Sequence, residues 1–283
     1  MWVGQQLADG LDFWGFLGSL ILGGIILGIY TGLLGYVGAK TGLSLDLLSQ
    51  RAFGEKGSYL PSAMTSFTQI GWFGVGSFVS GGTATPNFAR FAKNGKAGAI
   101  TTVVAFFIGN SLMFFFGAVS SIFVGGNDIF EVMVRLNLFY LAVLVLGLNI
   151  WTTNDNALYT AGLGLANIFH QRKKPMVLLS GIIGTVASVW LYYNFCGWLN
   201  ILNCTLPPVG TILVLAYFMN KEDFETDQPK LKTVDWFAVA GVILGAIVAN
   251  ILHWGIASIN GMVVAAVCYC VGPVSYTHLR AHE

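Results

Sequence analysis

Several polar residues that can do chemistry lie inside apolar stretches, where such side chains are costly and by default mark a site. The most polar stretch runs from residue 149 to 156 (NIWTTNDN). Two amides and two hydroxyls in it are spaced i, i+3, i+4 and i+7, which places on one helix face Asn149, Thr152, Thr153 and Asn156. Their oxygens suit a hard cation or the edge of a polar heterocycle. The alternative is hydrogen bonding between helices.

Two earlier segments can contribute to the same site. Gln69 lies three residues before Trp72, so on a helix an amide and an aromatic ring can contact one flat ligand. An aromatic anchor at the membrane interface is the alternative for this pair. Residues 77–83 (SFVSGGT) combine small polar side chains with glycines, a pattern typical of a point where a helix unwinds and frees backbone groups for a substrate. A flexible kink is the alternative there.

The sequence does not indicate an enzyme. Asp155 is the only acid within an apolar stretch, and no P-loop, GxSxG, HExxH or CxxC motif accompanies it. The four cysteines lack the spacing of a metal site. We therefore expect no catalysis and no organic cofactor.

The elements that must position these residues are membrane helices. Only 10% of the 283 residues are charged and 55% are hydrophobic, with a mean hydropathy of +0.71. Soluble chains carry about 25% charged residues, so a soluble enzyme or a nucleic-acid partner is excluded. At about 20 apolar residues per span, the sequence predicts an all-α protein with spans at 12–37, 58–90, 97–124, 136–163, 176–193, 197–219, 235–253 and 256–272. Glycines at 24, 28 and 32 predict close helix packing.

All but two of the 14 basic residues fall in four loops, at 40–56, 90–96, 172–174 and 221–232. Short loops rich in Lys and Arg stay in the cytoplasm, so we expect all four on the cytoplasmic side. The span 58–90 joins two of these loops, which a single crossing cannot do. Three explanations are open: the positive-inside rule fails here, the stretch 58–90 is a re-entrant hairpin, or spans are missing near this point. We expect missing spans, for a reason given by the resemblance described next.

These segments resemble the nucleobase–cation symporter family over about residues 1–272. The resemblance rests on residues 28–42 (GIYTGLLGYVGAKTG), 69–76 (QIGWFGVG), 107–113 (FIGNSLM) and 147–159 (GLNIWTTNDNALY). It implies a multi-pass transporter of the bacterial cytoplasmic (inner) membrane. The implied fold is a polytopic helical bundle of the inverted-repeat sodium-symporter type, with broken first and sixth helices and a site at the membrane midplane.

The resemblance also implies roles for single residues. Two aromatic rings would stack on the flat base, namely Trp72 and Phe78. Hydrogen bonds to its edge would come from Gln69, Ser80 and Asn149. A sodium ion would be held by Asn149, Thr152 and Thr153. The implied function is sodium-coupled nucleobase uptake, with cytosine the first choice. The alternatives are a permease for another flat heterocycle (purine, uracil or hydantoin) and a ligand-binding membrane protein that does not transport.

The chain departs from the family pattern near residue 75. Residues 1–75 resemble the first repeat and residues 76–273 resemble the sixth helix onward, so about eight of the family's twelve spans remain. Residues 274–283 (VSYTHLRAHE) read as a translated sequencing adapter rather than as part of the transporter. We expect this internally deleted and truncated copy to be a defective carrier.

Overall fold

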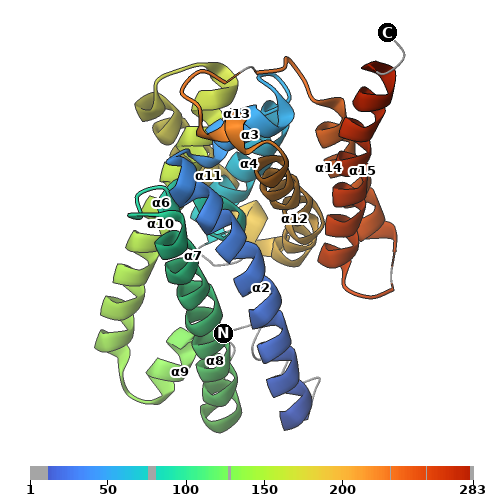
Figure 1. Ribbon diagram of the computed structural model, residues 1–283. Coiled ribbons are helices and arrows are strands. Elements are labelled where there is room, and N and C mark those ends of the chain that lie inside the picture. The colour runs from blue at the N-terminus through green and yellow to red at the C-terminus, as the bar shows by residue number, and fades with distance from the viewer. Residues whose placement is uncertain (1–11, 76–80, 127–128, 230, 253, 281–283) are drawn as a thin grey trace.

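The computed structural model describes residues 12–75, 81–126, 129–229, 231–252 and 254–280. Within these ranges every regular element is a helix (Figure 1). Four described helical segments are long and apolar enough to cross a membrane, at Phe13–Thr41, Gly95–Val124, Lys173–Leu191 and Gly197–Met219. The predicted fold class, a polytopic helical membrane protein, is confirmed.

The long helices are α2 (Phe13–Thr41), α4 (Tyr59–Val75), α8 (Asn110–Val124), α10 (Phe139–Phe169), α11 (Lys173–Tyr193), α12 (Phe195–Met219), α14 (Trp236–Ile251) and α15 (Ala257–Arg280). The shorter helices are α3 (Leu45–Phe53), α5 (Gly81–Ala84), α6 (Pro86–Ala89), α7 (Gly95–Val103), α9 (Ile129–Arg135) and α13 (Lys221–Glu225). The π-helical turn η1 (Val104–Gly109) joins α7 to α8. The prediction of one continuous span over 58–90 is wrong, because a turn at Thr85 separates α5 from α6 within the described residues.

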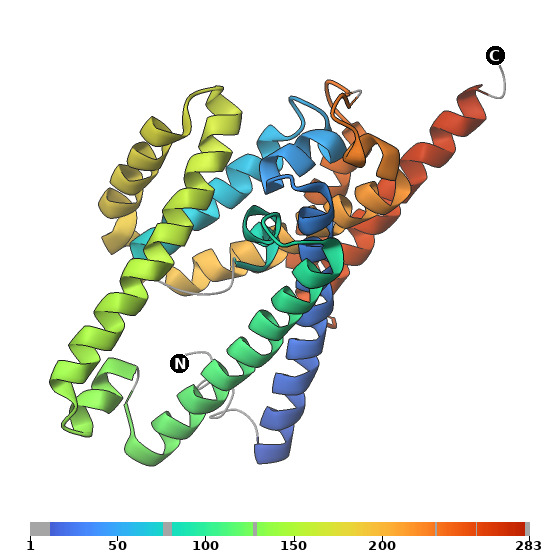
Figure 2. The ribbon, with the colours of Figure 1, turned by 60° about the vertical axis from the view of Figure 1, so that its left-hand side comes forward.

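The helices pack as three groups (Figure 2). Helices α4, α10 and α11 pack against one another on one side, and α12, α14 and α15 do so on the other. Helix α2 packs against α7, η1 and α8, and also against α12. The largest buried apolar cluster joins α2 and α3 to α12, α14 and α15, and it includes Leu34, Phe53, Leu213, Tyr217 and Val242.

Glycines let other helices approach α2 closely. A Cβ atom on Gly32 would lie 2.7 Å from the Val103 side chain of α7. A Cβ atom on Gly38 would lie 2.7 Å from the Cα atom of Pro86, the first residue of α6. The expected packing of the glycine stripe at 24–32 is confirmed, and the glycine face continues to the end of the helix. Gly38 therefore sets the position of α6 against α2.

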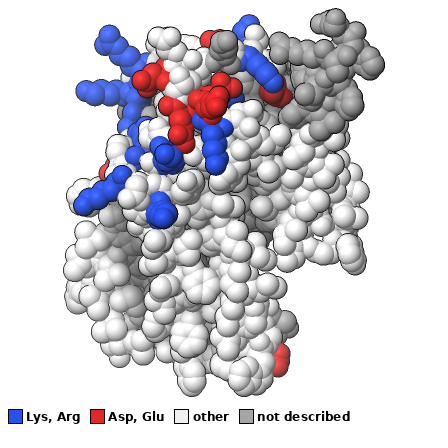
Figure 3. Space-filling model, in the orientation of Figure 1, with Lys and Arg blue, Asp and Glu red and all other residues white. Residues whose placement is uncertain are grey.

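The four basic loops are linked in pairs. Lys40 forms an ion pair with Glu225 of α13 at 3.7 Å, which joins loop 40–56 to loop 221–232. Arg90 donates to the Tyr159 hydroxyl at 2.5 Å, and the Lys173 ammonium lies 3.5 Å from the centre of the same ring. On the face that Figure 3 shows, charged side chains gather at the upper end, where Figure 1 places α3, α6 and α13, whereas α9 lies at the lower end. We call the upper end the basic end.

The close contact of α2 with α6 predicts that adding one methyl group at this contact lowers the stability of the protein. Gly38→Ala should destabilise the protein by about 1–3 kcal/mol, because the new Cβ atom meets backbone that cannot easily move. Gly23→Ala on the same helix is the matched control, since a Cβ atom there meets nothing within 4 Å. Thermal unfolding in detergent should show a lower melting temperature for the first variant only. Equal melting temperatures would contradict the close packing.

Candidate functional site

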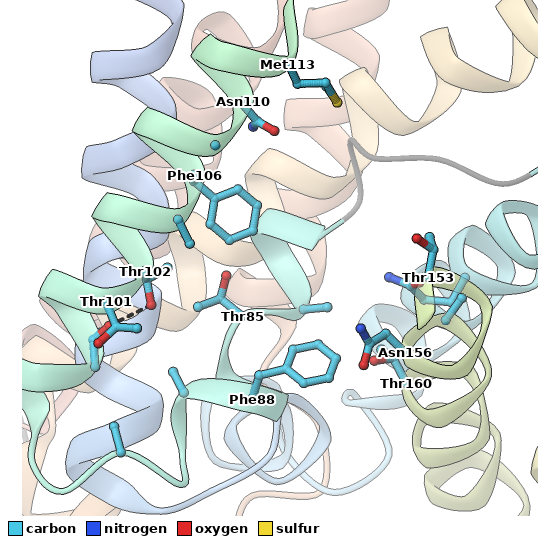
Figure 4. Close-up of a pocket in the computed structure, with 18 residues that line it drawn as sticks. Thr85, Phe88, Thr101, Thr102, Phe106, Asn110, Met113, Thr153, Asn156 and Thr160 are labelled. Carbon is cyan, nitrogen blue, oxygen red and sulfur yellow. Dashed lines mark hydrogen bonds between the residues drawn. The ribbon is translucent and has the colours of Figure 1, made fainter. Parts of the chain in front are cut away.

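A cavity of about 630 Å³ lies between α10 on one side and α7, η1 and α8 on the other, with α4, α5 and α6 completing its wall (Figure 4). This volume is within the range of about 300–1,000 Å³ found for small-molecule sites. Its polar and aromatic lining residues are Gln69, Thr85, Phe88, Thr101, Thr102, Phe106, Asn110, Thr153, Asn156 and Thr160. Every described lining residue is uncharged at neutral pH, so the cavity suits a neutral ligand with a few hydrogen-bonding groups.

Two of the predicted site residues meet at this cavity from different helices. Gln69 projects from α4 and is buried, and Thr153 projects from α10. Asn149 and Thr152 are exposed and lie outside the cavity lining. The Thr152 hydroxyl is 3.1 Å from the carbonyl oxygens of Leu148 and Asn149, so it donates within its own helix.

Three further predicted residues have no described side chain. The backbone of Trp72 is part of α4, but its side chain is outside the described part of the structure. Phe78 and Ser80 fall within residues 76–80, which are also outside it. The roles that the resemblance gives these three residues stay predictions.

The face of α10 that lines the cavity includes two of the four residues predicted to share a face. Thr153, Asn156, Ala157 and Thr160 all line the cavity and are spaced i, i+3, i+4 and i+7. Because α10 ends at Phe169 near Lys173, this set lies about one turn nearer the basic end than the set beginning at Asn149.

Sequence reasoning missed several lining residues for different reasons. Thr160 lies one turn after Asn156, and extending the predicted face by four residues would have found it. Phe106 lies in the π-helical turn η1, whose position is not evident from the local sequence. Phe88 lines the cavity because α6 is a separate short helix and not the end of a longer one.

A buried hydrogen-bond network joins α3, α4 and α10 between the cavity and the basic end. Ser62 donates to Asp46 at 2.6 Å. The amide of Asn167 on α10 donates to Ser62 at 2.9 Å and to Ser58 at 3.1 Å. Gln50 donates to Asn167 at 2.6 Å. The network fixes α4 against α10, and these two helices carry Gln69 and Thr153.

Burial raises the pKa of Asp46 to about 6, although the Ser62 hydrogen bond and the charge of Arg90 partly oppose this shift. Asp46 lies on α3, outside the membrane-spanning segments. Because the folded state raises this pKa from 3.8, protonation favours folding. The stabilisation is fully present below about pH 3.8 and is lost as the pH rises through about 6.

This shift predicts a pH-dependent stability. Between about pH 4 and pH 6.5 the unfolding free energy in detergent should fall by at most about 3 kcal/mol, since one pKa unit corresponds to about 1.4 kcal/mol. Asp46→Asn keeps an acceptor for Ser62 and should abolish the decrease in unfolding free energy that comes from deprotonation of Asp46. Asp227→Asn, at an exposed acid, should leave it unchanged. An Asp46→Asn profile that matches the unmodified chain would contradict the assignment.

The fold defines a polytopic membrane protein whose helical bundle contains an uncharged cavity of small-molecule size. The sequence pattern of the family described as permeases for cytosine/purines, uracil, thiamine and allantoin matches residues 1–84 and 74–277. The chain belongs to this family, which is a family of transporters rather than enzymes.

Individual relatives agree with this assignment. The cytosine permease of Escherichia coli strain K12 is 35% identical over 384 aligned positions, which cover 100% of this chain and 91% of that protein. The cytosine permease of Escherichia coli O157:H7 gives the same figures. The allantoin permease of Bacillus subtilis strain 168 is 34% identical over 82 residues, or 29% of this chain and 16% of that protein.

The alignment with the cytosine permease is longer than this chain. The alignment has 384 positions and this chain has 283 residues. At least 101 aligned positions of the cytosine permease therefore have no counterpart in this chain. The family pattern also matches in two segments, which overlap at residues 74–84. That overlap spans the end of α4 and the whole of α5.

Proposed function

We propose that the protein derives from a sodium-coupled nucleobase permease whose preferred substrate is cytosine, and that this copy is a defective carrier. The observation that carries the proposal is the uncharged cavity between α10 on one side and α7, η1 and α8 on the other, which Gln69 and Thr153 both line. A neutral pyrimidine needs an uncharged cavity with amide and hydroxyl groups on its wall. The match to a cytosine permease over the whole of this chain supports cytosine over other bases.

The proposed binding mode combines stacking with hydrogen bonds to the base edge. Gln69 offers both a donor and an acceptor to that edge, and Asn149 and Ser80 would complete the pattern. Trp72 and Phe78 would stack on the two faces of the ring. In this arrangement the stacking rings would select for a flat ligand, and the hydrogen bonds would select among flat ligands by their donors and acceptors.

The coupling ion would be held by oxygen atoms of α10. The Thr152 hydroxyl donates its proton to backbone carbonyls, which leaves lone pairs on its oxygen for a cation. Thr153 and Asn149 supply a second hydroxyl and an amide oxygen. Such neutral oxygen ligands are consistent with sodium.

The proposed membrane orientation places the basic end in the cytoplasm, because short basic loops stay on that side of the inner membrane. The pairing of loop 40–56 with loop 221–232 supports a common side for these two loops. The contacts of Arg90 and Lys173 with Tyr159 support the same conclusion for loops 90–96 and 172–174.

We propose that transport fails because part of the first repeat is absent. The missing alignment positions and the two-segment family match support a deletion near residue 75. Alternating access requires two repeats that move against each other around the site. Residues 274–283 would add a foreign tail after residue 273, and the backbone of α15 continues through it to Arg280.

A second candidate substrate class is another flat heterocycle, such as a purine, uracil or a hydantoin. The match of 82 residues to an allantoin permease favours this alternative, because allantoin carries a hydantoin ring. A non-transporting ligand-binding protein is the third possibility, and it would hold the base without a sodium requirement.

Uptake measurements distinguish these functions. A version restored with the missing segment of the Escherichia coli cytosine permease should accumulate labelled cytosine in proteoliposomes when a sodium gradient is applied, and this chain should not. In the restored version, Trp72→Ala and Asn149→Ala should each reduce uptake by about tenfold, through lost stacking or lost hydrogen bonds. Trp236→Ala is the control, because that ring is exposed on α14.

Three results of these uptake measurements would contradict the proposal. Uptake by the restored version without sodium, or stronger competition by uracil, adenine or hydantoin than by cytosine, would overturn the corresponding part of the proposal. Sodium-driven uptake by this chain would overturn its assignment as defective.

A further inference from the structure

Thr160 lines the cavity, and its buried hydroxyl has no hydrogen-bond partner among the described residues. Its side chain is only 2% exposed. Buried hydroxyls that make no hydrogen bond are destabilising and uncommon. The residue lines the cavity, so a ligand there can supply the missing hydrogen bond.

Two neighbouring groups complete a set of contacts around this hydroxyl. Asn156 lies one turn before Thr160 on α10 and lines the same cavity. The Phe88 side chain lies across the cavity on α6 and is 42% exposed, so part of the ring is free to contact a ligand (Figure 4). An amide, a hydroxyl and an aromatic ring are the groups needed to hold a flat ring with polar edges.

This set is displaced along α10 from Asn149, and Gln69 and Thr153 of the predicted site line the same cavity. Thr160 follows Asn149 by 11 residues, which corresponds to about 16 Å along a helix. The displacement is toward the basic end. Asp155 and Lys173 line an adjacent cavity of about 490 Å³, whose wall also includes Phe88 and Asn156. Neither charged residue lines the cavity that contains Thr160.

We propose that Phe88, Asn156 and Thr160 form a second binding position for a neutral planar heterocycle, on the route between the predicted site and the basic end. The inference rests on the proposed function, because it takes the ligand to be the transported base. A base that leaves the first site would stack on Phe88 and exchange hydrogen bonds with Asn156 and Thr160. Gln69 lines the same cavity and connects the two positions.

Equilibrium binding of tritiated cytosine to the purified chain in detergent tests this position. Thr160→Val should weaken binding at least threefold and Asn156→Ala about tenfold, as expected for lost hydrogen bonds. Thr185→Val is the matched control, since that hydroxyl is exposed on α11 and bonds to the Gly181 carbonyl.

A second readout separates binding from a structural role. Thr160→Val removes an unpaired buried hydroxyl, so it should raise the melting temperature of the ligand-free chain while it weakens binding. A merely structural residue would move both quantities in the same direction. The combination of a higher melting temperature and a lower affinity is therefore the supporting result.

Two results would overturn the inference. In the first, cytosine binds and Gln69→Ala weakens it, but Thr160→Val and Asn156→Ala have no effect; the second position is then absent and the proposed function stands. In the second, this chain binds no cytosine; uptake by the restored version then decides the proposed function separately.

Discussion

The contact between α4 and α10 is the interaction on which the cavity depends. The two helices approach closely at Gly164, where a Cβ atom would lie 2.8 Å from the Ser62 carbonyl oxygen. The network of Asp46, Ser62 and Asn167 fixes the same contact at the basic end. Since α4 precedes the proposed junction and α10 follows it, this contact also joins the two parts of the chain. Without it, Gln69 and Thr153 would not share a wall.

Features that repeat along one helix could be predicted from the sequence. Seven of the eight predicted apolar stretches coincide with described helices, and four of these are long and apolar enough to cross a membrane. The glycine spacing in α2 predicted its packing face. The polar spacing after residue 149 identified α10 as the helix with a ligand-facing side, because helical periodicity alone determines which residues share a face. The family resemblance, which the comparisons confirm, rested on these same segments.

Features that depend on contacts between distant residues could not be predicted. Asn167 meets Ser58 across 109 sequence positions, and neither residue alone indicates a network. Asp46 follows the N-cap Ser44 of a short helix and has the sequence context of an ordinary exposed acid, yet it is buried. The π-helical turn at Val104–Gly109 has no signal in the local sequence.

The central claim is that the cavity binds a neutral nucleobase, which requires no alternating access and so is testable on this chain. The most direct measurement is competition for bound tritiated cytosine by unlabelled cytosine and by cytidine monophosphate. The uncharged lining predicts displacement by cytosine and none by the nucleotide, whose phosphate would lose its hydration without a compensating charge. Displacement by the nucleotide as effective as that by cytosine would contradict the account.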